Sequence, residues 1–268
     1  SATLFAACNP DTATTTESAD SSTSSELKLL YWQSPTTLNP HLSNGIKDQE
    51  AASIVYEPLA AYDAEENLIP ILAAEIPSKS NGGISKDSTS VTWKLRDGIV
   101  WSDGEPFTAQ DVVATYDFIT DPATGATSSE FYGEIASVEA VDDLTVKVNF
   151  KQPTGATLSP FIGGSGMIIP AHIFKDYIGA NARSAPGNTK PVGTNAFQIR
   201  EFRPGDTIIY EPNPYFRGDP STFTTVELKG GGDAVSAARA VLQTQEADYA
   251  WNIQAEPSVI QELEASSS

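Results

Sequence analysis

The sequence predicts a mixed α/β protein, because strand patterns and helix patterns follow one another along most of its length. Apolar and polar residues alternate from Val91 to Leu95, and a helical pattern follows from Val112 to Ile119. A second alternating stretch, on both sides of Asp142-Asp143, predicts a hairpin. Near the C-terminal end, residues 225–253 have the pattern of a strand, a helix and another strand. Together these stretches indicate sheets combined with helices.

The strand over 91–95 is expected to be the first arm of a hairpin. Asp97-Gly98 favours a turn after it, and Ile99 to Trp101 resume the strand pattern as the second arm. Trp93 falls on the alternating apolar face, so we predict that its ring is buried.

A helix is expected next, because Thr108 stands three residues before Asp111. In this capping-box spacing the hydroxyl and the carboxylate each accept a hydrogen bond from a free backbone N–H. Asp121-Pro122 is expected to end the helix, since the residue before a proline avoids the helical conformation.

The remaining elements follow from the same two periodicities. Glycines at 230–232 precede one helix, but they lack the spacing of a phosphate-binding loop, and Asp233 is better interpreted as the N-cap of that helix. Strands are expected over 27–31, 196–202, 207–211, 225–228 and 247–253, and helices over 47–56, after Asp233 and over 257–265.

Composition limits the possible partners. The 268 residues are 40% hydrophobic and 19% charged, enough for one large or two modest domains. A formal net charge of −19 argues against nucleic acid or an anionic membrane surface as a partner, because both would be repelled. No stretch has the apolar length needed to span a bilayer.

Catalytic and metal-binding patterns are absent from the sequence. Its two histidines, His41 and His172, are far apart, and no HExxH, CxxC or His-x-His spacing occurs. The stretch GGSG at 163–166 lacks the G-x-S-x-G elbow of hydrolases. We therefore expect no enzyme activity, no catalytic residue, no metal site and no cofactor.

The single cysteine, Cys8, is informative through its position. It follows Leu4-Phe5-Ala6-Ala7, which resembles a bacterial lipobox, where the cysteine is lipidated and becomes the new N-terminus. Residues 1–8 would then be the remnant of a signal peptide, and residues 9–26, rich in Ser and Thr, a disordered tether. The alternative is an unmodified cysteine in a frayed terminus.

Three ordered blocks carry a family resemblance. They are LRDGIVWSDGEPFTAQDV at 95–112, PVGTNAFQIREFRPGDTIIYEPNPY at 191–215, and DAVSAARAVLQTQEADYAW at 233–251. In this order they resemble the solute-binding proteins of ABC importers, the oligopeptide, dipeptide and nickel class (family 5), from about residue 27 to the C-terminus. The chain departs from the family pattern where Asn195-Ala196 replaces Gly-Pro and Gln245 replaces Gly.

This resemblance implies the N-terminal half of a two-lobed, periplasmic-binding-protein-like fold of the class C type. The first lobe would comprise residues 27–75 and 188–253, interrupted by an inserted α+β subdomain at 76–187. Residues 254–268 would begin a second lobe that is otherwise missing.

The same resemblance implies the function. An extracytoplasmic, lipid-anchored binding protein would capture an oligopeptide or dipeptide between its lobes and deliver it to ABC permease subunits in the membrane, with nickel chelates, haem and sugars as other ligands known in the family. By position in the family, the candidate ligand contacts are Trp32, Gln33, Tyr132, Met167, Trp251 and Asn252. Plain core packing remains an alternative for each.

A second hypothesis comes from a different class of protein. The chain could be a truncated surface lipoprotein that acts as a protein-interaction module. Coding sequence continuing in frame beyond Ser268 would favour the transporter, and a stop codon without neighbouring permease genes would favour the module.

Overall fold

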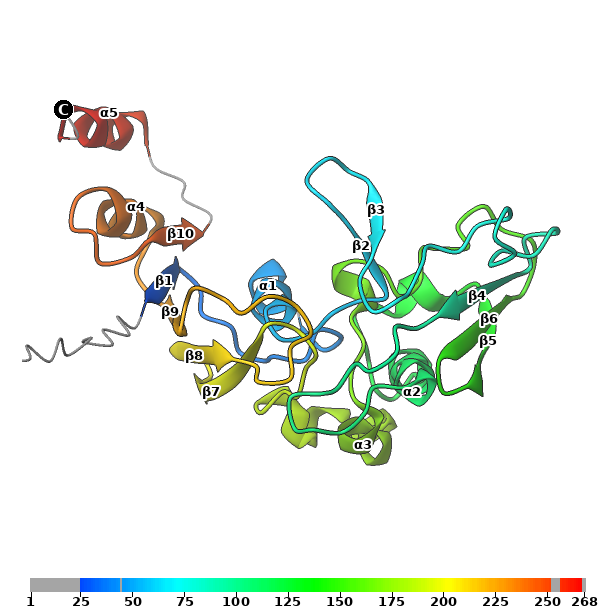
Figure 1. Ribbon diagram of the computed structural model, residues 1–268. Helices are drawn as coiled ribbons and strands as arrows, with labels where there is room; N and C mark the ends of the chain where they lie inside the picture. The colour runs from blue at the N-terminus through cyan, green and yellow to red at the C-terminus, as the bar shows by residue number, and fades with distance from the viewer. Residues whose placement is uncertain (1–24, 44, 252–255, 267–268) are drawn as a thin grey trace, which may run out of the picture.

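The computed structural model describes residues 25–43, 45–251 and 256–266. In this part of the chain two groups of elements lie side by side, with helix α1 (Ile46–Ser53) between them (Figure 1). One group is built on a five-stranded sheet and the other on a three-stranded sheet. The mixed α/β class predicted from the sequence is confirmed.

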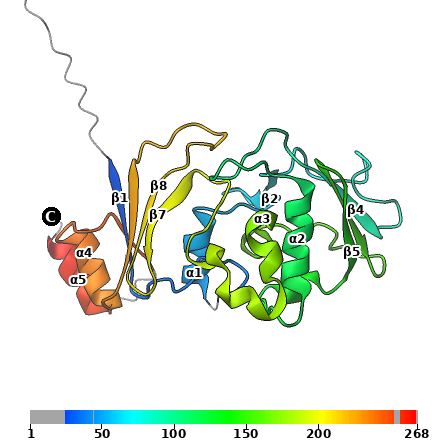
Figure 2. The same ribbon diagram turned by 90° about the horizontal axis from the view of Figure 1, so that it is seen from below.

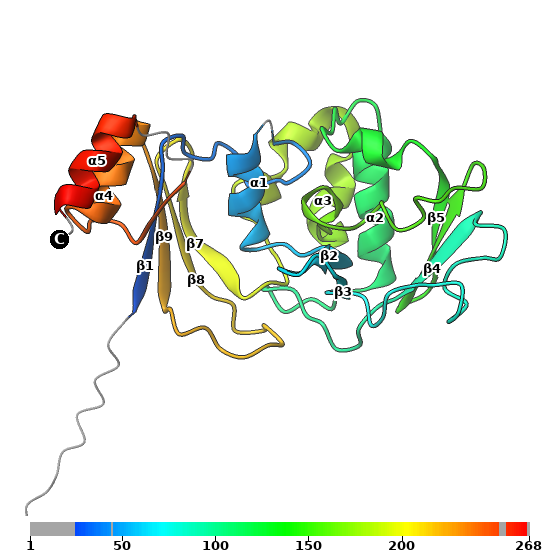
Figure 3. The same ribbon diagram turned by 90° about the horizontal axis from the view of Figure 1, so that it is seen from above.

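The five-stranded sheet joins the two ends of the described chain. β1 lies between β10 and β9 and runs parallel to both, and Tyr31 of β1 is the register partner of Trp251 in β10. Helices α4 and α5 lie on one side of this sheet and α1 on the other (Figures 2 and 3). The order across the sheet is β10 (Tyr249–Trp251), β1 (Glu26–Tyr31), β9 (Thr225–Gly230), β8 (Thr207–Pro212) and β7 (Phe197–Arg203).

The alternating apolar residues of these strands form a buried core on the side of the sheet that faces α1. A small core there is made of Tyr31, Leu38, Ala51, Val55, Ile208, Tyr210, Val226 and Leu228. The strands expected in this region are confirmed within one or two residues at the ends that the structure describes. Ile253, the expected end of the last strand, lies outside the described residues.

The three-stranded sheet has the antiparallel order β4 (Ser90–Lys94), β6 (Thr145–Phe150) and β5 (Ile135–Asp142). The predicted β5–β6 hairpin is confirmed. The predicted hairpin of 91–95 with 99–101 is wrong, because β4 pairs with β6 instead. The reason is that the apolar face of β4 meets Val146 and Val148 on β6, whereas residues 99–101 fold back through a bridge between Val100 and Pro106.

Helix α2 (Ala109–Thr120) begins and ends as predicted. Both bonds of the capping box between Thr108 and Asp111 are present, and Asp121 is the C-cap. The Asp111 carboxylate also accepts hydrogen bonds from Trp101 Nε1 (3.2 Å) and from the backbone N–H of Ala171 (2.8 Å). One buried carboxylate therefore ties three segments together, and its burial raises the pKa of Asp111.

The other helices are short or terminal. At α4 (Ala234–Leu242), Asp233 is the N-cap as predicted, accepting the backbone N–H groups of Val235 and Ser236 at 2.9 Å each. The remaining helical segments are α3 (Ala171–Phe174), α5 (Pro257–Ser266), η1 (Ser129–Tyr132), η2 (Gly164–Gly166), η3 (Lys175–Tyr177), η4 (Gly179–Ser184) and η5 (Pro186–Asn188).

The larger core connects the second group to the middle of the molecule. It contains buried residues from the three-stranded sheet and α2, such as Trp93 and Phe118, and it also includes Leu59 and Leu72. Leu59 and Leu72 flank the small hairpin of β2 (Ala60–Tyr62) and β3 (Leu68–Pro70). The segment just before residue 76 thus packs with the region predicted as an inserted subdomain.

Candidate ligand-binding site

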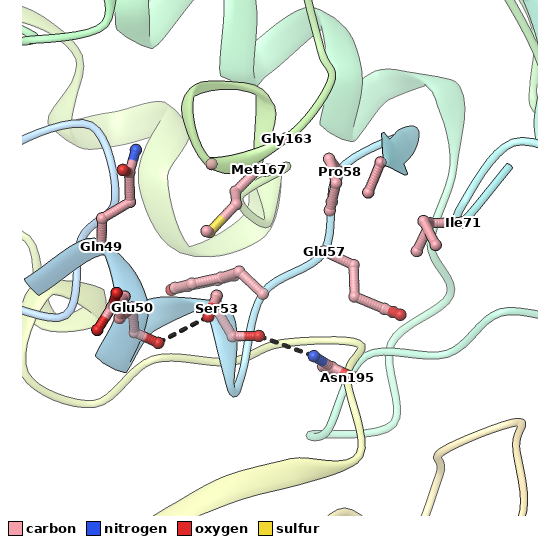
Figure 4. Close-up of a pocket in the computed structure, with 12 residues that line it drawn as sticks. Gln49, Glu50, Ser53, Glu57, Pro58, Ile71, Gly163, Met167 and Asn195 are labelled. Atoms are coloured by element: carbon pink, nitrogen blue, oxygen red, sulfur yellow. Dashed lines mark hydrogen bonds between the residues drawn. The ribbon is translucent and has the colours of Figure 1, made fainter. Parts of the chain in front are cut away.

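A cavity of about 460 Å³ lies between α1, the β2–β3 hairpin and the Gly-rich loop at 163–167. This volume is in the range of small-molecule sites, which is roughly 300 to 1,000 Å³. Figure 4 shows Met167 of the Gly-rich loop across from Ser53 of α1, with Asn195 beside Ser53. The lining residues are Gln49, Glu50, Ser53, Tyr56, Glu57, Pro58, Ala61, Ile71, Gly163, Gly164, Met167 and Asn195.

The Gly-rich loop has a backbone that few sequences allow. Gly163 has a φ of 57°, and a Cβ on Gly166 would lie 2.2 Å from the carbonyl carbon of Phe161. Phe161 itself has a φ of 66° although its side chain is fully buried. A bulky residue rarely adopts this left-handed conformation, and such strain persists only where surrounding packing enforces it. Tyr132 supplies part of that packing, with its ring edge-on to Phe161 at a centroid distance of 5.1 Å.

His41 holds the same loop from the other side. Its ring is fully buried; Nε2 donates to the carbonyl oxygen of Met167 at 2.8 Å, and Nδ1 accepts from the hydroxyl of Ser128 at 2.9 Å. Burial lowers the pKa of His41 to about 4, although the bond to the Met167 carbonyl favours the protonated form. His41 is therefore neutral at pH 7 and fixes the position of the loop.

We expect His41 to make the protein less stable in acid. The unfolded chain binds the proton near pH 6.5 and the folded chain only near pH 4, so the contribution is present above pH 6.5 and is lost as the pH falls to 4. The loss is of the order of 3 kcal/mol. Urea denaturation at several pH values measures it. The His41→Gln variant should show a smaller decrease over this interval, and an identical decrease in both proteins would contradict the assignment.

Glu57, one of the residues that line the cavity, forms an ion pair with Arg217. Arg217 donates two hydrogen bonds to this carboxylate, at 2.8 and 2.9 Å, and the hydroxyl of Thr194 donates a third at 2.8 Å. The Glu57 side chain is only 8% exposed. The pair joins the segment that follows α1 to the loop that follows β8, and the arginine offsets the charge of Glu57.

Glu50 connects the cavity to the end of the five-stranded sheet. Its Oε2 accepts a hydrogen bond from the hydroxyl of Tyr31 at 2.7 Å. The Tyr31 ring stacks on Trp251, with centroids 5.2 Å apart and an interplanar angle of 6°. Burial, together with the bond to Glu50, raises the pKa of Tyr31. Trp251 also stacks on Trp32, so the tyrosine that bonds to the carboxylate belongs to a cluster of three aromatic rings.

The ligand contacts proposed from the sequence fall into separate places. Met167 lines the cavity. Tyr132 is buried behind the Gly-rich loop, where its hydroxyl donates to the Ser165 carbonyl at 3.1 Å. Trp32 and Trp251 are partly buried at the sheet end, and Gln33 beside them is exposed.

Two of the predicted functional residues, Asn252 and Cys8, lie outside the described residues. The structure does bring Trp32 and Trp251 together. It does not place any proposed contact except Met167 among the residues that line the cavity.

Sequence reasoning missed Glu50, Glu57 and His41. Glu50 lies in a helix of ordinary polar composition, and only its hydrogen bond with Tyr31 distinguishes it from the other polar residues of that helix. His41 follows a proline in a loop, a setting that gave no sign of its bond to Met167 far along the chain. The run Tyr56-Glu57-Pro58 did carry a signal, because a carboxylate beside apolar residues at a helix end is commonly paired when buried.

The described part of the chain lacks a metal-binding cluster and a membrane-spanning helix. It contains no group of three or more His, Cys, Asp or Glu side chains placed to hold a metal ion. None of the helices there is both long and apolar enough to cross a bilayer.

Solved structures of binding proteins share this fold. The oligopeptide-binding protein AppA from Bacillus subtilis, in complex with a nonapeptide, is 27% identical with a TM-score of 0.73 over 83% of this chain and 43% of its own. The ABC transporter substrate-binding protein CtaP from Listeria monocytogenes is 26% identical, also with a TM-score of 0.73, over 91% of this chain and 47% of its own. These likenesses confirm the expected fold class, a lobe of a periplasmic-binding-protein-like fold.

The chain belongs to the bacterial extracellular solute-binding proteins, family 5, whose family model matches residues 67–267. Among curated relatives, the glutathione-binding protein GsiB from Shigella boydii is 30% identical over 231 residues, which are 85% of this chain and 42% of that protein. The chain thus spans about two fifths of the length of this relative.

Proposed function

We propose that this chain supplies one wall of the ligand cleft of an ABC-importer binding protein, which captures a short peptide or related small solute and delivers it to permease subunits in the membrane. The observation that carries the proposal is the cavity beside the strained Gly-rich loop, joined through Glu50 and Tyr31 to the aromatic rings at the end of the sheet. AppA is described with a bound peptide and GsiB is named for glutathione, itself a peptide.

The proposed mechanism needs no reacting group. A ligand that contacts two lobes stabilises the closed form through its higher affinity for that form. In this proposal the first lobe comprises residues 27–75 and 188–253, with residues 76–187 inserted and residues 254–268 leading into a second lobe. Trp32, Gln33, Tyr132, Met167, Trp251 and Asn252 remain the proposed contacts, with Glu50 added to them.

Calorimetry with a panel of dipeptides and oligopeptides tests the proposal. We expect the full-length gene product to bind at least one peptide, and the Trp251→Ala variant to bind it at least about tenfold more weakly, because an aromatic ring in a binding site is commonly worth 1 kcal/mol or more. Tyr249→Ala is the matched control, since that side chain is 50% exposed on the same strand. Circular dichroism checks that both variants fold.

The 268-residue chain alone should bind the same peptide much more weakly. One lobe supplies only part of the contacts to the ligand. Losing about 4 kcal/mol of binding free energy weakens binding roughly a thousandfold. Tight binding by the short chain would refute the two-lobe mechanism, and no binding by the full-length product to any peptide would refute the ligand class.

We also propose that a lipid on Cys8 anchors the protein at the outer face of the cytoplasmic membrane. The Ser- and Thr-rich residues between Cys8 and β1 would then act as a tether between the anchor and the folded lobe. Stable attachment takes two or more acyl chains. Cells grown with a radioactive fatty acid should label the wild-type protein and not Cys8→Ser. Equal labelling of the two would rule out the anchor.

A further inference from the structure

The two carboxylates that line the cavity differ in their electrostatic surroundings. Glu57 is matched by the guanidinium of Arg217. Glu50 is partly buried, and its side chain accepts a hydrogen bond from the neutral hydroxyl of Tyr31. Neither lysine, arginine nor histidine occurs among the lining residues. The cavity therefore presents one carboxylate whose charge is not offset by a neighbouring cation.

We propose that Glu50 binds a cationic group of the ligand, an ammonium or a guanidinium. This inference rests on the proposed function and names the ligand chemistry of the same cavity. The other polar groups nearby, on Gln49, Ser53 and Asn195, are neutral. Charge selection in this cavity thus falls to Glu50.

The surroundings of Glu50 favour a cation in three ways. A carboxylate that has lost part of its water binds a charged donor more strongly than a neutral one. The Tyr31 hydroxyl holds one carboxylate oxygen in place, which reduces the entropy lost when a ligand binds. The Tyr31 ring, which reaches the carboxylate through its hydroxyl, stacks on Trp251, and aromatic faces attract cations as well. The formal net charge of −19 adds a long-range attraction.

Small probes test the cation site without assuming a peptide ligand. The full-length gene product, labelled with ¹³C at glutamate side chains, is titrated with n-butylammonium, n-butylguanidinium and, as the neutral analogue, n-butanol. We expect the two cations to shift the Glu50 carboxyl signal and to bind at least about tenfold more tightly than butanol, as charge-assisted hydrogen bonds are stronger than neutral ones. Added salt should weaken the binding.

Two matched variants locate the effect. Glu50→Gln should lose the preference for the cation, whereas Glu65→Gln removes the same charge from the exposed tip of the β2–β3 hairpin and should leave the affinity within about twofold. Equal binding of butanol and butylammonium, or an unchanged preference in Glu50→Gln, would overturn the inference.

Peptides then identify the source of the cation. Ala-Lys-Ala is compared with Ala-norleucine-Ala, with Ala-Glu-Ala and with N-acetyl-Ala-Lys-Ala. An advantage of lysine over norleucine that depends on Glu50 assigns the site to a side chain, and an advantage lost on acetylation assigns it to the N-terminus of the peptide. Tighter binding of the glutamate peptide would overturn the inference. Binding of the small cations at Glu50 with no binding of any peptide would refute the proposed function and leave the cation site standing.

Discussion

Replacing Trp93 with alanine is expected to lower the free energy of unfolding by about 3 to 5 kcal/mol, the usual cost of removing a buried tryptophan. The ring is fully buried, and Trp93 pairs across the sheet with Val146 on the central strand β6. The surrounding core joins the three-stranded sheet to α2, so the cavity left behind cannot close without moving both. Urea denaturation followed by circular dichroism measures the change.

A milder substitution separates packing from hydrogen bonding at this position. Trp93 Nε1 is buried without a hydrogen-bond partner among the described residues, so Trp93→Phe removes no bond and should cost clearly less than Trp93→Ala. An unchanged denaturation midpoint in Trp93→Ala would show that the ring is not in the core.

Arg217→Ala is expected to destabilise the protein by about 3 kcal/mol, because it leaves the buried carboxylate of Glu57 without its cation. The arginine makes two bonds to Glu57, and only the Thr194 hydroxyl would remain. Glu57→Gln should reduce the stability as well, since the amide cannot accept both guanidinium N–H groups as the carboxylate does.

A matched pair on the surface is the control. Arg203 pairs with Glu201 at 2.8 Å, with side chains 59% and 51% exposed, so Arg203→Ala should cost no more than about 1 kcal/mol. A double-mutant cycle on Glu57 and Arg217 measures their coupling energy directly. Equal effects of Arg217→Ala and Arg203→Ala would mean that burial of Glu57 adds nothing to the pair.

Sequence patterns predicted an element correctly where the contacts that form it lie close together in the sequence. Thr108 and Asp111 stand three residues apart, and the bonds that start α2 form within that turn. The β5–β6 hairpin closes over Asp142-Asp143 in the same way. The partner of β4 was predicted wrongly because two candidates with strand character existed, one nearby at 99–101 and one about fifty residues later, and only burial of the shared face decides between them.

The site was less predictable than the fold. Met167 and the sheet-end tryptophans were proposed from the family resemblance, which places segments but not their side chains. The roles of three residues depend on distant partners: Glu50 bonds to Tyr31, Glu57 to Arg217 and His41 to Met167. The residues around each one in the sequence do not specify its partner. A functional carboxylate on a polar helix cannot be told from a solvated one until the packing around it is known.

The place of β1 inside its sheet has a consequence for how the chain must fold. Lys28 of β1 bonds to Asp248, which is 220 residues later, and β9 on the other side is almost as distant. Contacts of such separation form slowly, because a long loop must close before they contribute. At a synthesis rate of about 5 to 20 residues per second, β1 waits for roughly ten to forty seconds before its last neighbour exists. The three-stranded sheet and α2 can form during this time, while the five-stranded sheet remains open and its apolar strands exposed. The first residues of the folded lobe are therefore among the last to become stable.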